Sequence, residues 1–447
     1  MKVIAIDVPE LGNRCHLVHD GSVGLVVDPP RDLGRVEEAK ERAQVEIVAV
    51  ADTHLHNDYV SGAPALARRH GADYLLHADE DVDFARVGVR DGDVIAVGEV
   101  DVTALWTPGH TPLHTSFIAQ GAAGAVAVLS GGSLLHGTVG RTDLVDPALT
   151  EELARAQWGS VRRIAELVPA GAALHPTHGF GSFCASSAAD SGEGEVTVGS
   201  QWSRNPALTA DGTVFVADLL AGFGPVPDYY AYMAELNAAG AGAWPAREPV
   251  HVTEAHVAAA VAGGAWVVDL RSRRAYAEGH LAGTVSVEYG HQFATYVGWL
   301  APWGGDLVLL LDDPADLVGA ARDLAGIGID GLRAHVLAAD ALLPRPAGYR
   351  RTDWAGFAQP APDRVVVDVR QRGEYDAGHL PDALHVPVQE VERRLAEIPA
   401  GEVWVHCRSG YRAGIAASLL HRAGRDVVHI DDDWERVLDL GLHVRAA

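Results

Sequence analysis

The sequence Asp269-Leu-Arg-Ser-Arg-Arg-Ala-Tyr-Ala-Glu-Gly-His-Leu-Ala-Gly283 recurs as Asp368-Val-Arg-Gln-Arg-Gly-Glu-Tyr-Asp-Ala-Gly-His-Leu-Pro-Asp382, with seven identical residues in register. Each copy follows an apolar run typical of a buried strand. Each is followed by a second apolar strand and a helical stretch that ends at a glycine, Gly326 or Gly424. A period of about 100 residues is too long for a solenoid. The sequence therefore predicts two copies of one small α/β domain with a mostly parallel sheet.

A six-residue stretch inside the second copy, Cys407-Arg-Ser-Gly-Tyr-Arg412, carries the clearest chemical signal. The strand-like run 402–406 precedes it, and the helix-like run 413–423 follows it. We expect the sulfur of Cys407 at a strand end, among backbone N–H groups and at a helix N-terminus. Such a site stabilises an anion, and the thiolate is the nucleophilic form of cysteine. We predict that Cys407 is the catalytic residue.

Both copies resemble rhodanese domains through the D-x-R…Y…G-H-L element, and the second copy also through its cysteine loop. The resemblance implies that Cys407 accepts a sulfane sulfur, becomes a persulfide, and passes the sulfur to a thiol or cyanide. It implies that the loop residues cradle the persulfide and that two arginines attract an anionic donor such as thiosulfate or glutathione persulfide. The substrate-binding residues would be Ser409, Gly410 and Tyr411, and the arginines Arg408 and Arg412.

The first copy departs from this pattern. Aligned at the strand end, Asp312 takes the place of the cysteine, followed by a second aspartate and a proline. An aspartate cannot carry sulfur, and two carboxylates repel an anionic donor. We therefore expect a catalytically silent domain. In both copies the Asp, Arg and His of the shared element (Asp368, Arg370 and His379 in the second) are expected to brace strand-to-helix turns.

Histidines mark the N-terminal half, which is β-rich with interspersed helices. Three motifs follow strand-like runs: 53–59 with His54 and His56, 107–111 with His110, and 176–179 with His178. His54 and His56 lie two apart on an extended backbone and point to the same side, which suits a transition metal. Strands are predicted at 24–28, 45–50, 74–77, 100–105 and 125–129, and helices at 33–43 and 151–167.

This half resembles the metallo-β-lactamase superfamily, an αββα sandwich with metal at the strand ends. The T-P-G-H-T element, the G-R-T-D at 140–143 and the N-P-A-L at 205–208 resemble the persulfide dioxygenase branch. That branch oxidises glutathione persulfide to sulfite with one iron, held by residues matching His54, His110 and an aspartate. Some members carry a silent and an active rhodanese domain. The resemblance predicts domains at 1–240, 250–345 and 360–447.

Two residues depart from the metal-binding pattern. Tyr59 replaces the last histidine of H-x-H-x-D-H, and Gly132 replaces the expected aspartate. Tyr59 removes a ligand for a second metal, so a dinuclear hydrolase is not expected. Three hypotheses remain open: zinc or iron on His54, His56 and His110; a metal-free scaffold that binds persulfide; or a carboxylate such as Asp58 that restores dioxygenase activity.

Composition limits the partners, the cellular location and the disulfide bonds that the sequence allows. The net charge of −25 argues against a nucleic-acid or anionic-membrane partner. No signal peptide and no apolar stretch of about 18 residues is apparent, and the three cysteines are too scattered for a disulfide framework. We expect a cytoplasmic protein with reduced thiols. Cys15 and Cys184 are expected as small buried residues, although a redox role for Cys184 stays open, as does a homo-oligomer.

These patterns together predict a three-domain protein of sulfur metabolism. The expected fold is an αββα sandwich followed by two rhodanese-like parallel α/β domains, with linkers at 185–194, 238–249 and 343–363. The expected activity is sulfane-sulfur transfer through Cys407, from small-molecule sulfur donors to thiol acceptors. The alternatives are persulfide oxidation at an atypical metal site and a non-enzymatic persulfide-binding scaffold.

Overall fold

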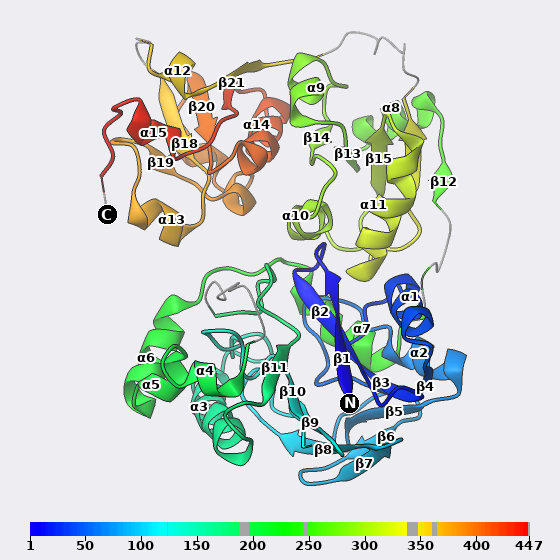
Figure 1. Cartoon of the computed structure of the whole chain (residues 1–447). Helices are drawn as coiled ribbons and strands as arrows, with labels where there is room; N and C mark the ends of the chain where they lie inside the picture. Colours follow the sequence, from blue (N-terminus) through cyan, green and yellow to red (C-terminus); the bar gives the residue numbers. More distant parts are fainter. Residues whose placement is uncertain are drawn as a thin grey trace. The chain divides into compact units, whose positions relative to one another are not determined.

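The computed structural model describes residues 1–122, 124–186, 196–242, 244, 249–337, 347–359 and 364–445. The chain divides into two units, one formed by 1–247 with 322–330 and the other by 248–321 with 331–447 (Figure 1). Part of each expected linker lies outside the described residues. The second unit contains both repeats except for residues 322–330 of the first, and the predicted boundaries of the repeats stay a prediction.

The first unit is built on two sheets. The six-stranded sheet has the order β1-β2-β3-β4-β5-β6, with strands Lys2–Val8, Asn13–His19, Val23–Val27, Glu46–Ala51, Asp73–His77 and Val87–Val89. The five-stranded sheet has the order β11-β10-β9-β8-β7, and its strands β7 to β11 are Val94–Val97, Val100–Trp106, Thr115–Gly121, Val126–Gly131 and Ala173–Pro176. The helices α1 to α7 are Gly34–Ala43, Ala63–His70, Thr150–Leu167, Val198–Gln201, Pro206–Thr209, Gly212–Gly222 and Tyr230–Ala239.

Three apolar layers make this unit an αββα sandwich. One core cluster joins the first sheet to α1 and α2 and includes Val50 and Leu66. A second lies between the sheets and joins Leu25 to Phe117. A third joins the second sheet to α3 and α6 and includes Val161. A sheet with apolar residues on both faces must be covered twice, so the layers follow from the strand sequences, and the expected fold class is confirmed.

The second unit repeats one five-stranded parallel sheet. The first sheet has the order β12-β16-β15-β13-β14, and the second the matching order β17-β21-β20-β18-β19. Strands β12 to β16 are Val250–His251, Trp266–Asp269, Val285–Ser286, Leu307–Leu311 and Arg333–Val336. Strands β17 to β21 are Arg350–Thr352, Val365–Asp368, Leu384–His385, Glu402–His406 and Asp426–Ile430. The internal repeat seen in the sequence is therefore a repeat of fold.

Helices complete each repeat. The first repeat has α8 to α11, at Glu254–Ala262, Arg273–Glu278, Phe293–Leu300 and Pro314–Gly326. The second has α12 to α15, at Trp354–Phe357, Arg372–Ala377, Tyr411–Arg422 and Arg436–Asp439, and 3-10 turns at Val388–Glu390 and Leu395–Glu397. Strands β15 and β20 are buried almost throughout, which explains their near-continuous apolar sequences.

The shared sequence element braces the turn after β13 and after β18. In the second repeat Arg370 pairs with Asp368 at 2.7 Å and donates to the carbonyl of Gly378. In the first repeat Arg271 pairs with Asp269 at 2.6 Å and donates to the carbonyl of Gly279. The histidine of each copy stacks on the tyrosine four residues before it, with ring centroids 3.8 Å and 3.9 Å apart. The expected structural role of these residues is confirmed.

Strand register corrects the expected position of the silent residue. Asp269 pairs with Leu310 across β13 and β15, and Asp368 pairs with His406 across β18 and β20. Leu310 is therefore the counterpart of His406, and the residue matching Cys407 is Leu311 rather than Asp312. Asp312 lies one step further on, in a connection that is shorter than the cysteine loop.

Candidate functional site

Cys407 lies where β20 ends and before α14 begins, and its side chain is buried. The carbonyls of Arg408 and Gly410, in the loop that follows, form hydrogen bonds with other parts of the domain. The ring of His429 bonds the Gly410 carbonyl at 2.9 Å, and the Trp434 N–H donates to the Arg408 carbonyl at 2.7 Å. In the described part of the chain the backbone N–H groups of Arg408 and Ser409 donate to no other group. This arrangement leaves amide donors for an anion.

Gly410 shapes the loop. Its φ of +85° lies in the left-handed region, which favours glycine. A Cβ at this position would lie 2.1 Å from an Asp431 carboxylate oxygen. Gly410 is therefore required both by its backbone conformation and by the close approach of the Asp431 side chain, and it starts the helix that carries Arg412.

The two loop arginines have different surroundings. Arg412 is largely buried and forms two hydrogen bonds with the Glu374 carboxylate, at 2.5 and 2.8 Å. Burial alone would lower the pKa of Arg412, but Glu374 raises it. Arg408 is exposed and pairs with Glu435 at 3.3 Å. Much of the positive charge expected beside the sulfur is thus balanced by carboxylates.

Residues of the silent repeat lie beside the cysteine loop. Tyr296 of α10 is buried; burial raises the pKa of its hydroxyl, Arg412 opposes this, and Cys407 adds to it. The hydroxyl of Tyr411 donates to the carbonyl of Glu288 at 3.0 Å, so Tyr411 turns toward the first repeat rather than toward a bound sulfur. These interactions place Tyr296 within electrostatic range of the nucleophile.

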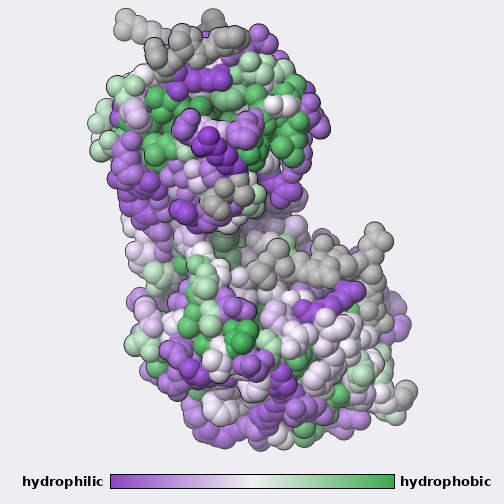
Figure 2. All heavy atoms as spheres, turned by 90° about the vertical axis from the view of Figure 1, so that its left-hand side faces the viewer, coloured by the Kyte–Doolittle hydropathy of each residue, from purple (hydrophilic) through white to green (hydrophobic). Residues whose placement is uncertain are grey.

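A hollow on the second repeat is separate from this loop. It has a volume of about 780 Å³ and an apolar lining that includes Phe357, Val366 and Leu380. Figure 2 shows apolar residues gathered on the upper part of the visible face, with a more mixed surface below. None of the lining residues belongs to the cysteine loop, so the hollow is not assigned to the sulfur chemistry.

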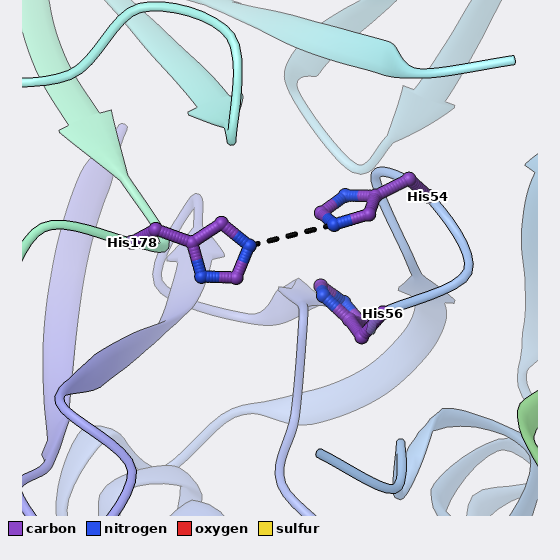
Figure 3. A group of neighbouring side chains, drawn as sticks. All are labelled: His54, His56 and His178. Carbon is purple, nitrogen blue, oxygen red and sulfur yellow. Dashed lines mark hydrogen bonds between the residues drawn. The ribbon is translucent and has the colours of Figure 1, made fainter. Parts of the chain in front are cut away.

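The histidines of the first unit converge in a buried cluster. His54 and His56 follow β4, and His178 follows β11; their rings face one another (Figure 3). The Nε2 atoms of His54 and His178 lie 3.4 Å apart. The ring of His110, which follows β8, has its centroid 4.7 Å from that of His54 and 5.2 Å from that of His178. The three sequence motifs therefore meet, as their positions at strand ends predicted.

His56 differs from the other rings because it faces carboxylates. Its Nε2 lies 3.2 Å from Asp28 and 3.7 Å from Asp52, and all three residues are buried. Burial would lower the pKa of His56, but the two carboxylates raise it to about 10. Burial lowers the pKa of His110 and of His178 to about 3, so these two rings are neutral. The ion pair of His56 competes with its expected role as a metal ligand.

Three groups of potential ligand atoms each fit within 4.8 Å, and two of them contain His178: His54 with His56 and His178, and His110 with His178 and Cys184. The expected set of His54, His56 and His110 is thus divided between two groups that share His178. A third group, Asp28 with Asp52 and His56, is the ion pair described above. The sequence showed His178 as a strand-end histidine and Cys184 six residues after it, near the expected pocket, but it did not indicate Cys184 as a potential ligand.

The iron ligands of the persulfide dioxygenase pattern do not fit this site. A Cβ on Gly132 would lie 2.1 Å from Cδ2 of His110, so the ring of His110 occupies the space that an aspartate would need. The N–H of Gly132 donates to Nε2 of His114 at 3.0 Å. Tyr59 stacks on His56 and donates to the Asp28 carbonyl. Asp58 belongs to neither group of histidines.

Comparisons with known proteins agree with the two folds. The metallo-beta-lactamase superfamily model matches residues 8–170, and the rhodanese-like domain model matches residues 354–439. The chain therefore contains a metallo-β-lactamase domain followed by a rhodanese-like domain. A metallo-beta-lactamase from Staphylococcus aureus subsp. aureus COL superposes with a TM-score of 0.66 at 25% identity, over 75% of this chain and 99% of that chain.

Curated relatives match over shorter segments. A hydroxyacylglutathione hydrolase of Cereibacter sphaeroides is 33% identical over 175 residues, which is 37% of this chain and 63% of the relative. An HTH-type transcriptional regulator of Mycobacterium tuberculosis is 33% identical over 121 residues, which is 26% of this chain and 46% of the relative. The chain spans less than two thirds of either relative. Within the described residues no helix is both long and apolar enough to cross a bilayer.

Proposed function

We propose that the protein is a rhodanese-type sulfurtransferase that moves sulfane sulfur through a persulfide on Cys407. One observation carries the proposal: a buried cysteine lies between β20 and α14 in a loop whose carbonyls are bonded elsewhere, while the N–H groups of Arg408 and Ser409 donate to no other group among the described residues. Backbone N–H groups at a helix N-terminus stabilise a thiolate or a persulfide anion. The rhodanese-like match over residues 354–439 includes this loop.

The transfer runs in two displacements. The Cys407 thiolate attacks the sulfane sulfur of thiosulfate, the S–S bond of the donor breaks, and sulfite leaves with the bonding electron pair. Glutathione persulfide reacts in the same way and releases the glutathione thiolate. An acceptor thiolate then attacks the terminal sulfur of the enzyme persulfide, and the Cys407 thiolate leaves. No oxidant is needed, because the sulfane sulfur keeps its oxidation state.

The silent repeat supports this chemistry from outside the loop. Its Tyr296 lies near the nucleophile, and Ser286 of β14 donates its backbone N–H to Ser418 of α14 at 2.9 Å. Arg273 of α9 forms an ion pair with Asp431, and the carboxylate of Asp431 lies close to Gly410. The first repeat therefore positions the helix and the loop of the second without carrying sulfur itself.

Persulfide oxidation by the N-terminal domain is the weaker alternative. A facial two-histidine, one-carboxylate iron site needs the aspartate that Gly132 replaces. Of the carboxylates that remain, Asp28 pairs with His56, and one oxygen of Asp58 accepts from Asn13 at 2.7 Å. No oxidative step is assigned to this domain. Iron bound at one equivalent per chain together with oxygen consumption on glutathione persulfide would contradict this assignment.

The proposal is tested with Cys407→Ser. We expect thiosulfate and glutathione persulfide sulfurtransferase activity to fall to the uncatalysed background. The wild-type protein treated with thiosulfate should gain the mass of one sulfur atom, and the variant should not. Cys15→Ala is the matched control, because Cys15 is also a buried free thiol. Activity or sulfur loading retained in Cys407→Ser would reject the assignment.

A further inference from the structure

Three potential ligand atoms in the first unit converge away from the cysteine loop. They are the side-chain donor atoms of His110, His178 and Cys184, which lie within 4.8 Å of one another. All three side chains are fully buried. The histidines follow β8 and β11, and the backbone of Cys184 is fixed by the N–H of Arg141, which donates to its carbonyl at 2.9 Å.

Hydrogen bonds set the tautomer of each ring. Nδ1 of His110 lies 2.7 Å from the carbonyl of Arg141, which can only accept, so Nδ1 carries the proton. Nδ1 of His178 lies 3.0 Å from the amide oxygen of Asn13 and donates in the same way. Each Nε2 is therefore left with a lone pair. Among the described residues Nε2 of His110 is buried and has no hydrogen-bond partner, which is costly unless a ligand occupies the site.

His54 offers a further lone pair beside His178, as a member of the neighbouring group with His56. The hydroxyl of Thr53 donates to Asp28, so it accepts from Nδ1 of His54, and Nε2 of His54 is also unprotonated. That atom faces Nε2 of His178 at 3.4 Å. Two lone pairs at this distance repel unless a cation lies between them. Nitrogen ligands about 2.0–2.1 Å from a tetrahedral zinc ion would lie about 3.4 Å apart.

The surroundings of Cys184 suit a thiolate bound to a cation. Its thiol hydrogen-bonds to the Asp58 carboxylate, and the hydroxyl of Tyr230 bonds the sulfur. Asn13 holds both Asp58 and His178 with its one amide group. A divalent ion, one thiolate and the neighbouring carboxylate sum to zero charge, which satisfies the requirement that buried charges be balanced.

We infer that the N-terminal domain binds a thiophilic divalent ion of the zinc class through His110, His178 and Cys184. The Cys184 thiolate thus supplies the negative charge that an aspartate in place of Gly132 would have supplied. It comes from a different segment of the chain. Softer sulfur and imidazole donors favour zinc over the iron that a carboxylate-containing site would hold. Binding converts the thiol to a thiolate and releases its proton to water. The inference does not depend on the chemistry at Cys407.

Cobalt(II) titration tests the site, because a cobalt–thiolate bond gives a near-ultraviolet charge-transfer band that histidine ligands do not. All proteins carry Cys407→Ser, so that only the two N-terminal thiols can contribute. We expect one equivalent of cobalt per chain with the band present, and the band lost in Cys184→Ser. Cys15→Ala should keep the band, because Cys15 lies in the separate core of the first sheet with α1 and α2.

A second measurement covers the case in which Cys184→Ser does not fold. X-ray absorption of the zinc-loaded full chain should show one sulfur neighbour beside nitrogen neighbours. Failure to bind one equivalent of cobalt or zinc would overturn the inference. A charge-transfer band that survives Cys184→Ser, or a zinc shell without sulfur, would overturn it equally.

Discussion

The two repeats of the second unit share a sheet, a brace and a ring stack, yet differ at one connection. Both have the same strand order, the Asp–Arg pair after the second strand, and the tyrosine–histidine stack. They diverge between β15 and α11 in one copy and between β20 and α14 in the other. Residues outside the cysteine loop therefore specify the fold. The silent repeat keeps the fold although it lacks this loop.

The β20–α14 connection and the β15–α11 connection differ in length as well as in chemistry. Four residues separate β20 from α14, and two separate β15 from α11. Leu311, the counterpart of Cys407, is still in the strand and fully buried. Proline begins α11, so an N–H at the helix start is missing as well. The silent repeat therefore lacks the sulfur, the space and one donor.

The largest expected effect comes from moving the cysteine between the repeats. In the double variant Cys407→Ser with Leu311→Cys, we expect sulfurtransferase activity to stay at least about 10³-fold below wild type, because the shorter connection offers no cradle. Steady-state assays with thiosulfate and mass spectrometry for the added sulfur measure this. Restored activity would show that the residue type alone, and not the loop, separates the two repeats.

The braces provide the next test, on stability. Asp368→Asn leaves the buried Arg370 without its carboxylate, and we expect a loss of about 3–5 kcal/mol in the free energy of unfolding. Asp269→Asn should cost less, because the side chain of Arg271 is more exposed, at 13% against 4%. Urea unfolding of the full chain measures both. Equal, negligible losses would contradict the bracing role.

Sequence reasoning succeeded where chemistry and spacing coincide. The repeat, the cysteine loop and the three histidine motifs were visible because each pairs particular residue types with a strand end. The predicted strands at 45–50 and 100–105 match β4 and β8 closely, as does the helix at 151–167 with α3. Strands such as β2 and β9 were not predicted, because His16, Ser116 and Gln120 interrupt their apolar pattern.

The other features of the candidate sites could not be predicted, because they depend on contacts between residues far apart in the sequence. No spacing in the sequence shows that β11 brings His178 to His54, or that Cys184 lies beside His110. Tyr296 reaches the cysteine loop from the other repeat. The identity of Leu311 as the counterpart of Cys407 follows from strand register, which an alignment at the strand end misplaces by one residue.

A smaller effect should appear with pH, at a histidine that the active repeat has and the silent repeat lacks. His429 is replaced by Ala334 at the matching register of the silent sheet. Burial lowers the pKa of His429 to about 4, below its ordinary value of 6.5, so its contribution is complete above pH 6.5 and is lost as the pH falls toward 4. Between pH 7 and pH 5 we expect a loss of about 2 kcal/mol, which His429→Gln should reduce.

Chemical unfolding at several pH values measures this slope. Gln keeps an amide N–H that can donate to the Gly410 carbonyl, so the variant removes the titration while sparing the contact. Neighbouring charges from Asp431, Arg273 and Arg351 are unchanged in it. An identical slope in wild type and His429→Gln would show that other groups cause the acid sensitivity.

The smallest expected effect concerns Glu374, whose counterpart in the silent repeat is Ala275. Glu374→Gln removes the carboxylate that neutralises Arg412, while the amide oxygen can still accept the Gln371 N–H. We expect KM for thiosulfate to fall roughly two- to fivefold with little change in kcat, because the freed cation attracts the dianionic donor. The matched control is Glu435→Gln at the exposed Arg408 pair, which should change KM less. A rise in KM for Glu374→Gln would mean that the carboxylate positions Arg412 rather than masking its charge.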